Sequence, residues 1–94
     1  MQINQVEGRD CGKIMLYALS TCGWCRRTKK LLNELGVEYS FIDVDLLTGD
    51  DKKMVVAEIK KHNPRISFPT VVFRDEKAVI GFDEDAIKEE VKNG

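Results

Sequence analysis

The sequence has no excess of charge of either sign and no long apolar run, and it contains a single histidine. Its 15 Lys and Arg side chains nearly balance its 16 Asp and Glu side chains, so the net charge of −1 provides no basic field for nucleic acid or anionic membrane. No apolar run approaches the roughly 18 residues that a membrane-spanning helix needs. The 94 residues suit one small domain. We expect a monomer with neither nucleic acid nor a membrane among its partners.

Cysteine is also scarce, and the three cysteines do not suit a framework of structural disulfides. Residues 1–8 have neither the basic start nor the apolar stretch of a signal peptide, so we expect a cytoplasmic location. Cytoplasmic thiols stay reduced, and an odd number of cysteines fits poorly with paired bridges. Cys22 and Cys25 have the spacing C-x-x-C, which in such a compartment indicates redox chemistry or metal binding.

The pattern of apolar residues predicts four strands and three helices. An apolar run without alternation over residues 13–19 is typical of a strand that is covered on both faces. A helix and a second strand follow it, which predicts a right-handed crossover between two parallel strands. A second helix, a hairpin and a final helix capped by Asp83 complete the chain. The predicted strands are residues 13–19, 37–45, 70–73 and 78–81, and the predicted helices are residues 24–35, 51–62 and 84–92.

This βαβαββα order predicts an α/β fold in which helices flank both faces of a four-stranded mixed sheet. We expect a single domain over residues 13–94. Residues 1–12 alternate weakly and contain turn-forming glycines, so they form either a tail or a short edge strand. In the second helix, Met54, Val55 and Ile59 are expected to point inward.

Cys22 and Cys25 fall at the start of the first helix and differ in their expected burial. At a helix N-terminus, unpaired backbone N–H groups and the helix dipole stabilise a thiolate, and Cys22 is expected to be the more exposed thiol. Cys25 shares a core-facing stripe with Thr28 and Leu32, so its pKa should be the higher one. We therefore expect Cys22 to attack a substrate disulfide and Cys25 to resolve the mixed disulfide, which leaves a reversible Cys22–Cys25 disulfide.

The residues beside the two thiols bear on their reactivity and on partner binding. Arg26 and Arg27 either lower the pKa of a nearby thiolate or extend into water, where their charges are screened. Gly23 leaves the Cys22 sulfur uncrowded. Trp24 lies off the core-facing stripe, and it is either an exposed platform for a partner or a partly buried packing residue.

A metal site is the competing interpretation of the C-x-x-C pair. A structural zinc site needs four ligands, and the candidates for the other two are Cys11 and His62. The first strand separates Cys11 from Cys22 by roughly 20 Å, at about 3.3 Å per residue. His62 ends the second helix without a paired ligand. A four-ligand zinc site is therefore disfavoured, and the alternative function is a metal or iron–sulfur cluster module in which Cys22 of two protomers holds the cluster.

Four separated segments stand out together: Cys22-Gly23-Trp24-Cys25, the basic residues Arg26, Arg27 and Lys29, Phe68-Pro69-Thr70, and Gly81-Phe82-Asp83. In these segments the chain resembles the glutaredoxin family of the thioredoxin-like superfold, over residues 13–93. The resemblance implies an oxidoreductase of electron transport and cell redox homeostasis that reduces protein disulfides. It implies no bound cofactor, a reductase or glutathione as electron donor, and a cis Pro69 beside Cys22. The implied substrate-binding residues are Thr21, Gly23, Trp24, Phe68, Pro69, Gly81, Phe82 and Asp83.

Three departures from the pattern of that family concern the electron donor. Phe82 replaces the second glycine of a Gly-Gly-Asp that glutathione-using members carry before the last helix. Leu19 stands where many of them carry a lysine. The motif is Cys-Gly-Trp-Cys rather than Cys-Pro-Tyr-Cys. Together these features resemble the members that serve ribonucleotide reductase or other proteins and are recharged by a thioredoxin-type reductase, and the choice between that donor and glutathione stays open.

Overall fold

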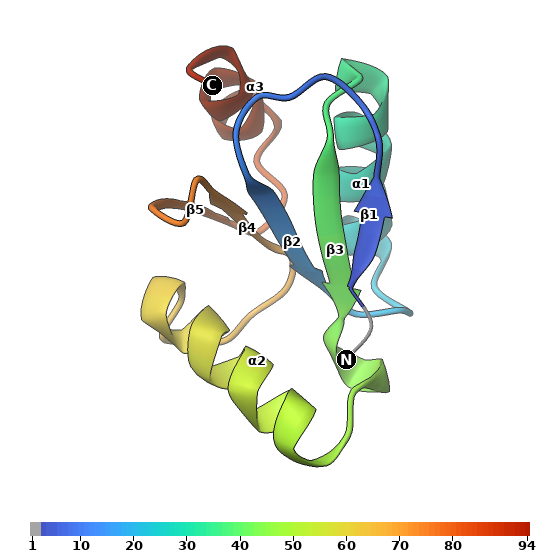
Figure 1. The fold of residues 1–94 in the computed structure, drawn as a ribbon, viewed down its shortest axis with the longest axis vertical. Helices are drawn as coiled ribbons and strands as arrows, with labels where there is room; N and C mark the ends of the chain where they lie inside the picture. Colours follow the sequence, from blue (N-terminus) through green and yellow to red (C-terminus); the bar gives the residue numbers. More distant parts are fainter. Residues whose placement is uncertain (1–2) are drawn as a thin grey trace.

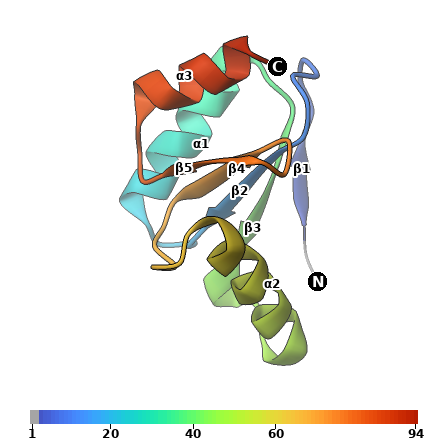
Figure 2. The same ribbon diagram turned by 90° about the vertical axis from the view of Figure 1, so that its left-hand side faces the viewer.

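The computed structural model of the chain describes residues 3–94 as a mixed sheet with helices on both of its faces (Figures 1 and 2). The strands are β1 (Asn4–Val6), β2 (Ile14–Ala18), β3 (Tyr39–Asp43), β4 (Thr70–Phe73) and β5 (Lys77–Ile80). The helices are α1 (Gly23–Leu35), the 3-10 helix η1 (Val44–Leu46), α2 (Gly49–His62) and α3 (Glu84–Lys92). The strand order is β1-β3-β2-β4-β5; β2 and β3 are parallel, and the other neighbours are antiparallel. This arrangement confirms the predicted α/β fold.

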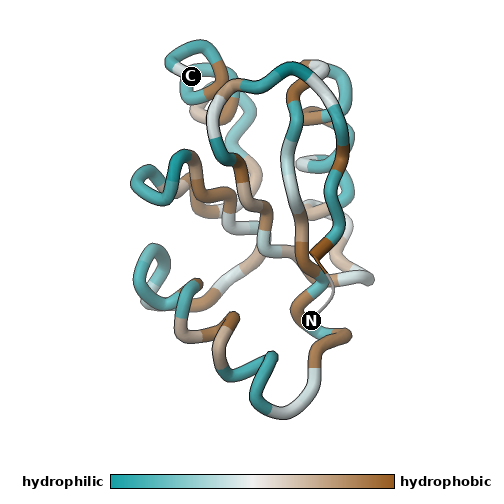
Figure 3. The backbone as a smooth tube through the Cα atoms, viewed as in Figure 1, coloured by the Kyte–Doolittle hydropathy of each residue, from teal (hydrophilic) through white to brown (hydrophobic). Residues whose placement is uncertain are grey.

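The strands build one apolar core on each face of the sheet. Helices α1 and α3 cover one face, where Leu32 and Ile87 pack in a cluster with Leu16 of β2. Helix α2 covers the other face, where Ile59 packs in a cluster with Tyr17 of β2. The structure thus covers both faces of β2, as the continuous apolar run in its sequence predicted. Figure 3 shows hydrophobic residues along the central strands and hydrophilic ones in the loop from β1 to β2. Within residues 3–94, no helix is both long and apolar enough to cross a membrane.

The sheet has five strands rather than the expected four, because Asn4–Val6 forms β1 at its edge, which is the short edge strand given as one of the two alternatives for residues 1–12. β1 pairs antiparallel with β3, and an isolated bridge between Arg9 and Val37 continues this contact along the chain. Residues 1–2, which belong to the same N-terminal expectation, lie outside the described residues. The extra strand was hard to predict because its three residues are mostly exposed and give only a weak alternating pattern.

Two expectations about the second strand and the second helix are wrong in detail. The strand ends at Asp43 rather than at residue 45, because the next residues wind into η1. In α2, Val55 and Ile59 are buried as predicted, but Met54 is 61% exposed. Val55 and Ile59 lie one turn apart and define the buried stripe, whereas adjacent residues on a helix do not share a face. Met54 therefore lies outside the buried stripe, and it lines an open hollow together with Met15 and Tyr17 of β2.

Candidate active site

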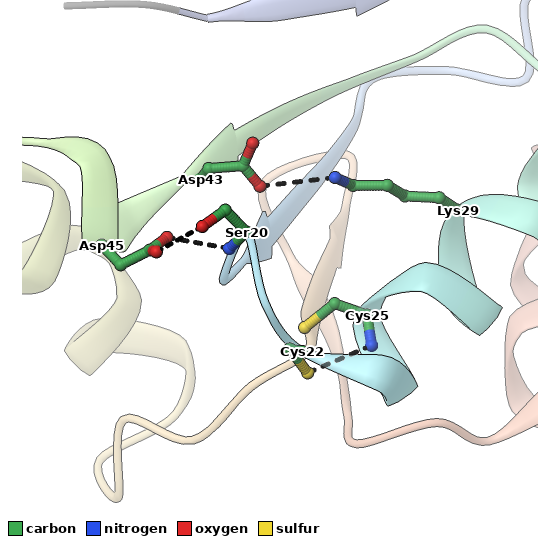
Figure 4. A network of polar contacts seen from close by, with 6 residues as sticks. All are labelled: Ser20, Cys22, Cys25, Lys29, Asp43 and Asp45. Atoms are coloured by element: carbon green, nitrogen blue, oxygen red, sulfur yellow. Dashed lines mark hydrogen bonds and ion pairs between the residues drawn. The ribbon is translucent and has the colours of Figure 1, made fainter.

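Cys22 ends the loop that follows β2 and forms the N-cap of α1. Its backbone is extended, with φ −87° and ψ 120°, and its Sγ accepts a hydrogen bond from the Cys25 backbone N–H at 3.2 Å (Figure 4). The sulfur thus takes the place that a Ser or Asp side-chain oxygen takes in most helix caps. The backbone N–H groups of the first turn and the helix dipole favour negative charge at this position. The predicted location of Cys22 at a helix N-terminus is confirmed.

Asp45 of η1 holds the loop that carries Cys22. Its carboxylate accepts hydrogen bonds from the Ser20 hydroxyl and, at 2.8 Å, from the Ser20 backbone N–H (Figure 4). These hydrogen bonds hold the pKa of Asp45 below its usual range. Our sequence analysis missed this contact. A signal for it existed, because both residues follow the neighbouring parallel strands β2 and β3, whose carboxyl ends meet at one edge of the sheet.

Cys25 is fully buried, whereas Cys22 is only half-buried. Burial, followed by the hydrogen bond with Cys22, raises the pKa of the Cys25 thiol to about 12. A backbone hydrogen bond from Leu19 and the charge of Lys29 act in the opposite direction and lower this pKa. Cys25 is therefore a neutral thiol at neutral pH. The expected inequality of the two cysteines in burial, with a high pKa for Cys25, is confirmed.

A groove of about 250 Å³ lies between the start of α1 and the segment before α3. Five of the predicted substrate-binding residues come together in its lining, and the Phe68–Pro69 peptide bond is cis, as the resemblance implied. Gly81 has a φ of 80°, in the left-handed region that favours glycine. The lining residues are Trp24, Phe68, Pro69, Gly81 and Phe82.

The other three predicted substrate-binding residues lie outside this lining. Thr21 and Gly23 are exposed on either side of Cys22 in the chain. Asp83 is the N-cap of α3, and its carboxylate accepts a hydrogen bond from the Ala86 backbone N–H at 3.1 Å. Its predicted capping role is confirmed, and the carboxylate occupies part of the anion-favouring end of that helix.

Trp24 is 56% exposed, so more than half of its side chain is accessible beside the thiols. Its ring stacks on Phe82 with 5.8 Å between the ring centroids. The Arg27 guanidinium lies 4.8 Å from the centroid of the Trp24 ring, at a distance typical of a cation–π contact. Both Arg26 and Arg27 are exposed, and Arg27 is directed at the indole.

The remaining cysteine and the histidine lie apart from the C-x-x-C pair in the fold. Cys11 is buried in the loop before β2, at the opposite end of that strand from Cys22, and the Arg9 Nε donates a hydrogen bond to its Sγ at 3.4 Å. His62 is the last residue of α2. Among residues 3–94, no three His, Cys, Asp or Glu side chains form a group that could hold a metal ion.

A half-exposed and a buried thiol in a C-x-x-C pair, at the N-terminus of a helix on a mixed sheet, define the class of dithiol–disulfide oxidoreductases. Comparison with known proteins identifies the family within that class. The glutaredoxin family model matches residues 14–79, and the chain belongs to the glutaredoxin family. Glutaredoxins use a dithiol redox couple and take glutathione as a substrate, not as a bound cofactor.

Individual relatives agree with this assignment. Glutaredoxin 1 of Rickettsia bellii is 33% identical over 72 residues, which cover 76% of this chain and 70% of the relative. The crystal structure of the glutaredoxin from Methanosarcina mazei superimposes with a TM-score of 0.91 at 46% identity, over 97% of this chain and 88% of that one. Methanoredoxin of Methanosarcina acetivorans gives a TM-score of 0.86 at 48% identity, over 89% and 88%. The fold is thioredoxin-like, as predicted, and the protein is a dithiol–disulfide oxidoreductase.

Proposed function

We propose that this protein reduces protein disulfides through a reversible Cys22–Cys25 disulfide, in which Cys22 attacks and Cys25 resolves. The observation that carries the proposal is the inequality of the two thiols. Cys22 is half-exposed at a position that favours a thiolate, and Cys25 is buried with a pKa of about 12. A substrate disulfide can reach the half-exposed Cys22 sulfur, and the buried Cys25 sulfur lies about one helical turn further along α1.

The reaction consists of two exchanges. The Cys22 thiolate first attacks one sulfur of the substrate disulfide; a Cys22–substrate S–S bond forms, the substrate S–S bond breaks, and the second substrate sulfur leaves as a thiolate that takes a proton from water. Cys25 then loses its proton to water and attacks the Cys22 Sγ. The Cys22–Cys25 bond forms, the mixed disulfide breaks, and the substrate leaves reduced by two electrons.

The groove supports a protein rather than glutathione as the preferred partner. Trp24 and Phe82 stack on one another, and both line the space beside Gly81. The apolar walls suit a side chain that flanks a protein disulfide, and Phe82 crowds the approach of a charged tripeptide to the start of α3. The proposed donor is therefore a thioredoxin-type reductase, and glutathione is the weaker candidate. In this proposal Thr21, Gly23 and Asp83 also contact the substrate, from positions beside the residues that line the groove.

The assignment of the two cysteines is tested by trapping mixed disulfides. Cys25→Ser should form a stable mixed disulfide with a protein disulfide such as that of insulin, because no resolving thiol remains. Cys22→Ser should form none, because Cys25 is buried and protonated. Full insulin-reducing activity of Cys22→Ser with a dithiol donor would overturn the assignment. A Cys11→Ser variant is the matched control, since Cys11 lies in the loop before β2.

The donor and the alternative function are tested with the same preparation. Oxidised protein is offered glutathione with glutathione reductase, and separately a thioredoxin reductase; faster recharging by the latter supports the proposed donor. Anaerobically purified protein with visible charge-transfer bands and no reductase activity would favour the cluster module that uses Cys22.

The proposal also covers the oligomeric state and the location of the protein. A monomer is sufficient because both thiols belong to one chain. A cytoplasmic location suits a reducing dithiol because the dithiol needs continual recharging. Gel filtration and fractionation test these two points.

A further inference from the structure

Lys29 is a lysine of α1 whose charged end is fixed by two residues of β3. It lies on α1 four residues after Cys25, a spacing that places two side chains on one face of a helix. Its Nζ lies 3.3 Å from the Asp43 Oδ1 and 4.1 Å from the centroid of the Phe41 ring. The side chains of Lys29 and Asp43 are only 24% and 18% exposed. A surface lysine normally keeps its ammonium in water, so this placement has a cost that calls for an explanation.

The ion pair lies at the end of the sheet against which Cys25 packs. Asp43 ends β3 and is in register with Ala18, the last residue of β2. The next residue, Leu19, supplies a backbone hydrogen bond to Cys25. Figure 4 shows Lys29 reaching from α1 to Asp43 in the same region as the two cysteines. Lys29 thus shares a face of α1 with Cys25, and its ammonium is fixed at the end of β3.

The charged and titratable groups around Cys25 come from several elements. Cys22 precedes it in the loop, Lys29 follows it on α1, and Asp43 and Asp45 lie on the sheet side of the loop (Figure 4). Among these, Cys22 raises the pKa of Cys25 and Lys29 lowers it. Asp45 is engaged by Ser20 and Asp43 by Lys29. Of these four groups, Lys29 is the cation that lowers the pKa of Cys25, and its ammonium is held in place by its ion pair with Asp43.

The resolving step requires that negative charge. In the mixed disulfide Cys22 carries no charge, but burial still raises the pKa of the Cys25 thiol and keeps its ionised fraction small at neutral pH. We propose that Lys29 is a positioning residue of the resolving step: its ammonium, fixed by Asp43 and Phe41, stabilises the charge that develops on the Cys25 Sγ as it attacks Cys22. This inference rests on the proposed function. Lys29 transfers no proton; the proton of Cys25 leaves to water, and the substrate sulfur departs with the electron pair of the mixed disulfide.

The size of the effect follows from two opposing trends. Loss of the ammonium is expected to raise the pKa of Cys25 and to lower its thiolate fraction by up to about tenfold. The more basic thiolate is about threefold more nucleophilic. The resolving step should therefore become about threefold slower at every pH below the pKa of Cys25.

Stopped-flow reaction with a limiting amount of Ellman's reagent separates the two steps. Attack by Cys22 releases a first coloured thiolate, and attack by Cys25 on the resulting mixed disulfide releases a second. For Lys29→Met the second phase should be about threefold slower between about pH 6 and pH 9, with the first phase unchanged. Lys29→Arg, which keeps the charge, should restore the second phase. Lys30→Met, at the next and exposed position, should match the wild type.

The outcomes distinguish this inference from the proposed function. An unchanged second phase in Lys29→Met overturns the inference and leaves the roles of Cys22 and Cys25 intact. An equal slowing of both phases also overturns it, since it indicates a loss of structure around the whole site. A wild-type protein that releases only the first thiolate contradicts the resolving role of Cys25, and the inference falls with it.

Discussion

The Trp24 indole stacks on the Phe82 ring, with 5.8 Å between the ring centroids and 28° between the ring planes. The two residues come from the first turn of α1 and from the segment before α3, and the contact closes one wall of the groove beside the thiols. The Arg27 guanidinium lies over the same indole. Such contacts are each worth about 0.5–1.5 kcal/mol, so they restrict a tryptophan that is otherwise more than half exposed.

Removal of the Phe82 ring should widen the range of electron donors. Phe82→Gly opens the wall of the groove and leaves the Asp83 cap of α3 in place. Relief of crowding is worth roughly 1–3 kcal/mol, so glutathione-dependent turnover should rise about tenfold. The measurement is the rate of NADPH oxidation with glutathione and glutathione reductase. Phe82→Leu retains bulk and serves as the control, and an unchanged rate in Phe82→Gly would show that the ring does not restrict glutathione.

The pKa of Cys25 sets the pH dependence of its modification. With reduced protein and iodoacetamide, Cys22 should react first because it is the more exposed thiol. After Cys22 has reacted, burial still holds the pKa of Cys25 above its ordinary value, so the rate at Cys25 should rise about tenfold per pH unit without a plateau near neutral pH, since only the thiolate reacts. Peptide mass spectrometry after timed quenching measures both sites. A plateau for Cys25 near neutral pH would contradict the neutral, buried thiol.

The features that could be predicted from the sequence are those encoded by local periodicity. Cys25, Thr28 and Leu32 recur at helical spacing after a strand, so the first helix, its buried stripe and the inequality of the cysteines could be deduced. The resemblance to glutaredoxins added the cis Pro69, which local pattern alone does not specify. The hairpin and the cap at Asp83 were likewise visible as local signals.

The features that escaped prediction depend on contacts between distant segments. The sequence left residues 1–12 as either a tail or a short edge strand, and only the pairing of β1 with β3 decides between them. The exposure of Met54 depends on how α2 rests on the sheet, because the apolar pattern alone does not locate the centre of the buried stripe. The contacts of Asp45 with Ser20 and of Lys29 with Asp43 join the loop and helix of the site to the end of β3 and to η1. Each arises from the topology of the sheet.

Asp45 should contribute stability that depends on pH. Its pKa in the folded chain lies below the ordinary value, because the Ser20 hydroxyl and N–H donate to the carboxylate. Such a group stabilises the fold above its unfolded pKa of about 4, and this contribution is lost as the pH falls through the lower folded pKa. Asp45→Ala should therefore lower the urea midpoint at neutral pH, and the difference from wild type should vanish in strong acid.

A carboxylate without a side-chain partner provides the control for this experiment. Glu76 is exposed in the turn between β4 and β5, and no hydrogen bond or ion pair of its side chain occurs within residues 3–94. Glu76→Ala should leave the urea midpoint unchanged at both pH values. A difference between Asp45→Ala and wild type that persists in acid would indicate that Asp45 acts through packing rather than through its charge.

Gly8 should be the least replaceable glycine of the N-terminal segment. A Cβ at Gly8 would lie 2.6 Å from the Val37 carbonyl carbon and 2.7 Å from the Gly36 carbonyl oxygen. Both are backbone atoms, and Arg9 is hydrogen-bonded to the same stretch through its N–H, at 2.8 Å from the Gly36 oxygen. The segment can move away only by breaking that bridge, so Gly8→Ala should lower the free energy of unfolding by roughly 1–3 kcal/mol.

Gly23 provides the matched substitution, because a Cβ there meets no atom within 4 Å and lies at the start of α1. Since alanine has a higher helix propensity than glycine, Gly23→Ala should leave the free energy of unfolding unchanged or raise it by up to about 1 kcal/mol. Urea unfolding of both variants is the measurement. Equal midpoints for Gly8→Ala and wild type would mean that residues 8 and 9 are not held against residues 36–38, which precede β3. A loss confined to Gly8→Ala shows instead that the weakly patterned N-terminal segment is bound to the sheet through a close backbone contact that leaves no room for a side chain.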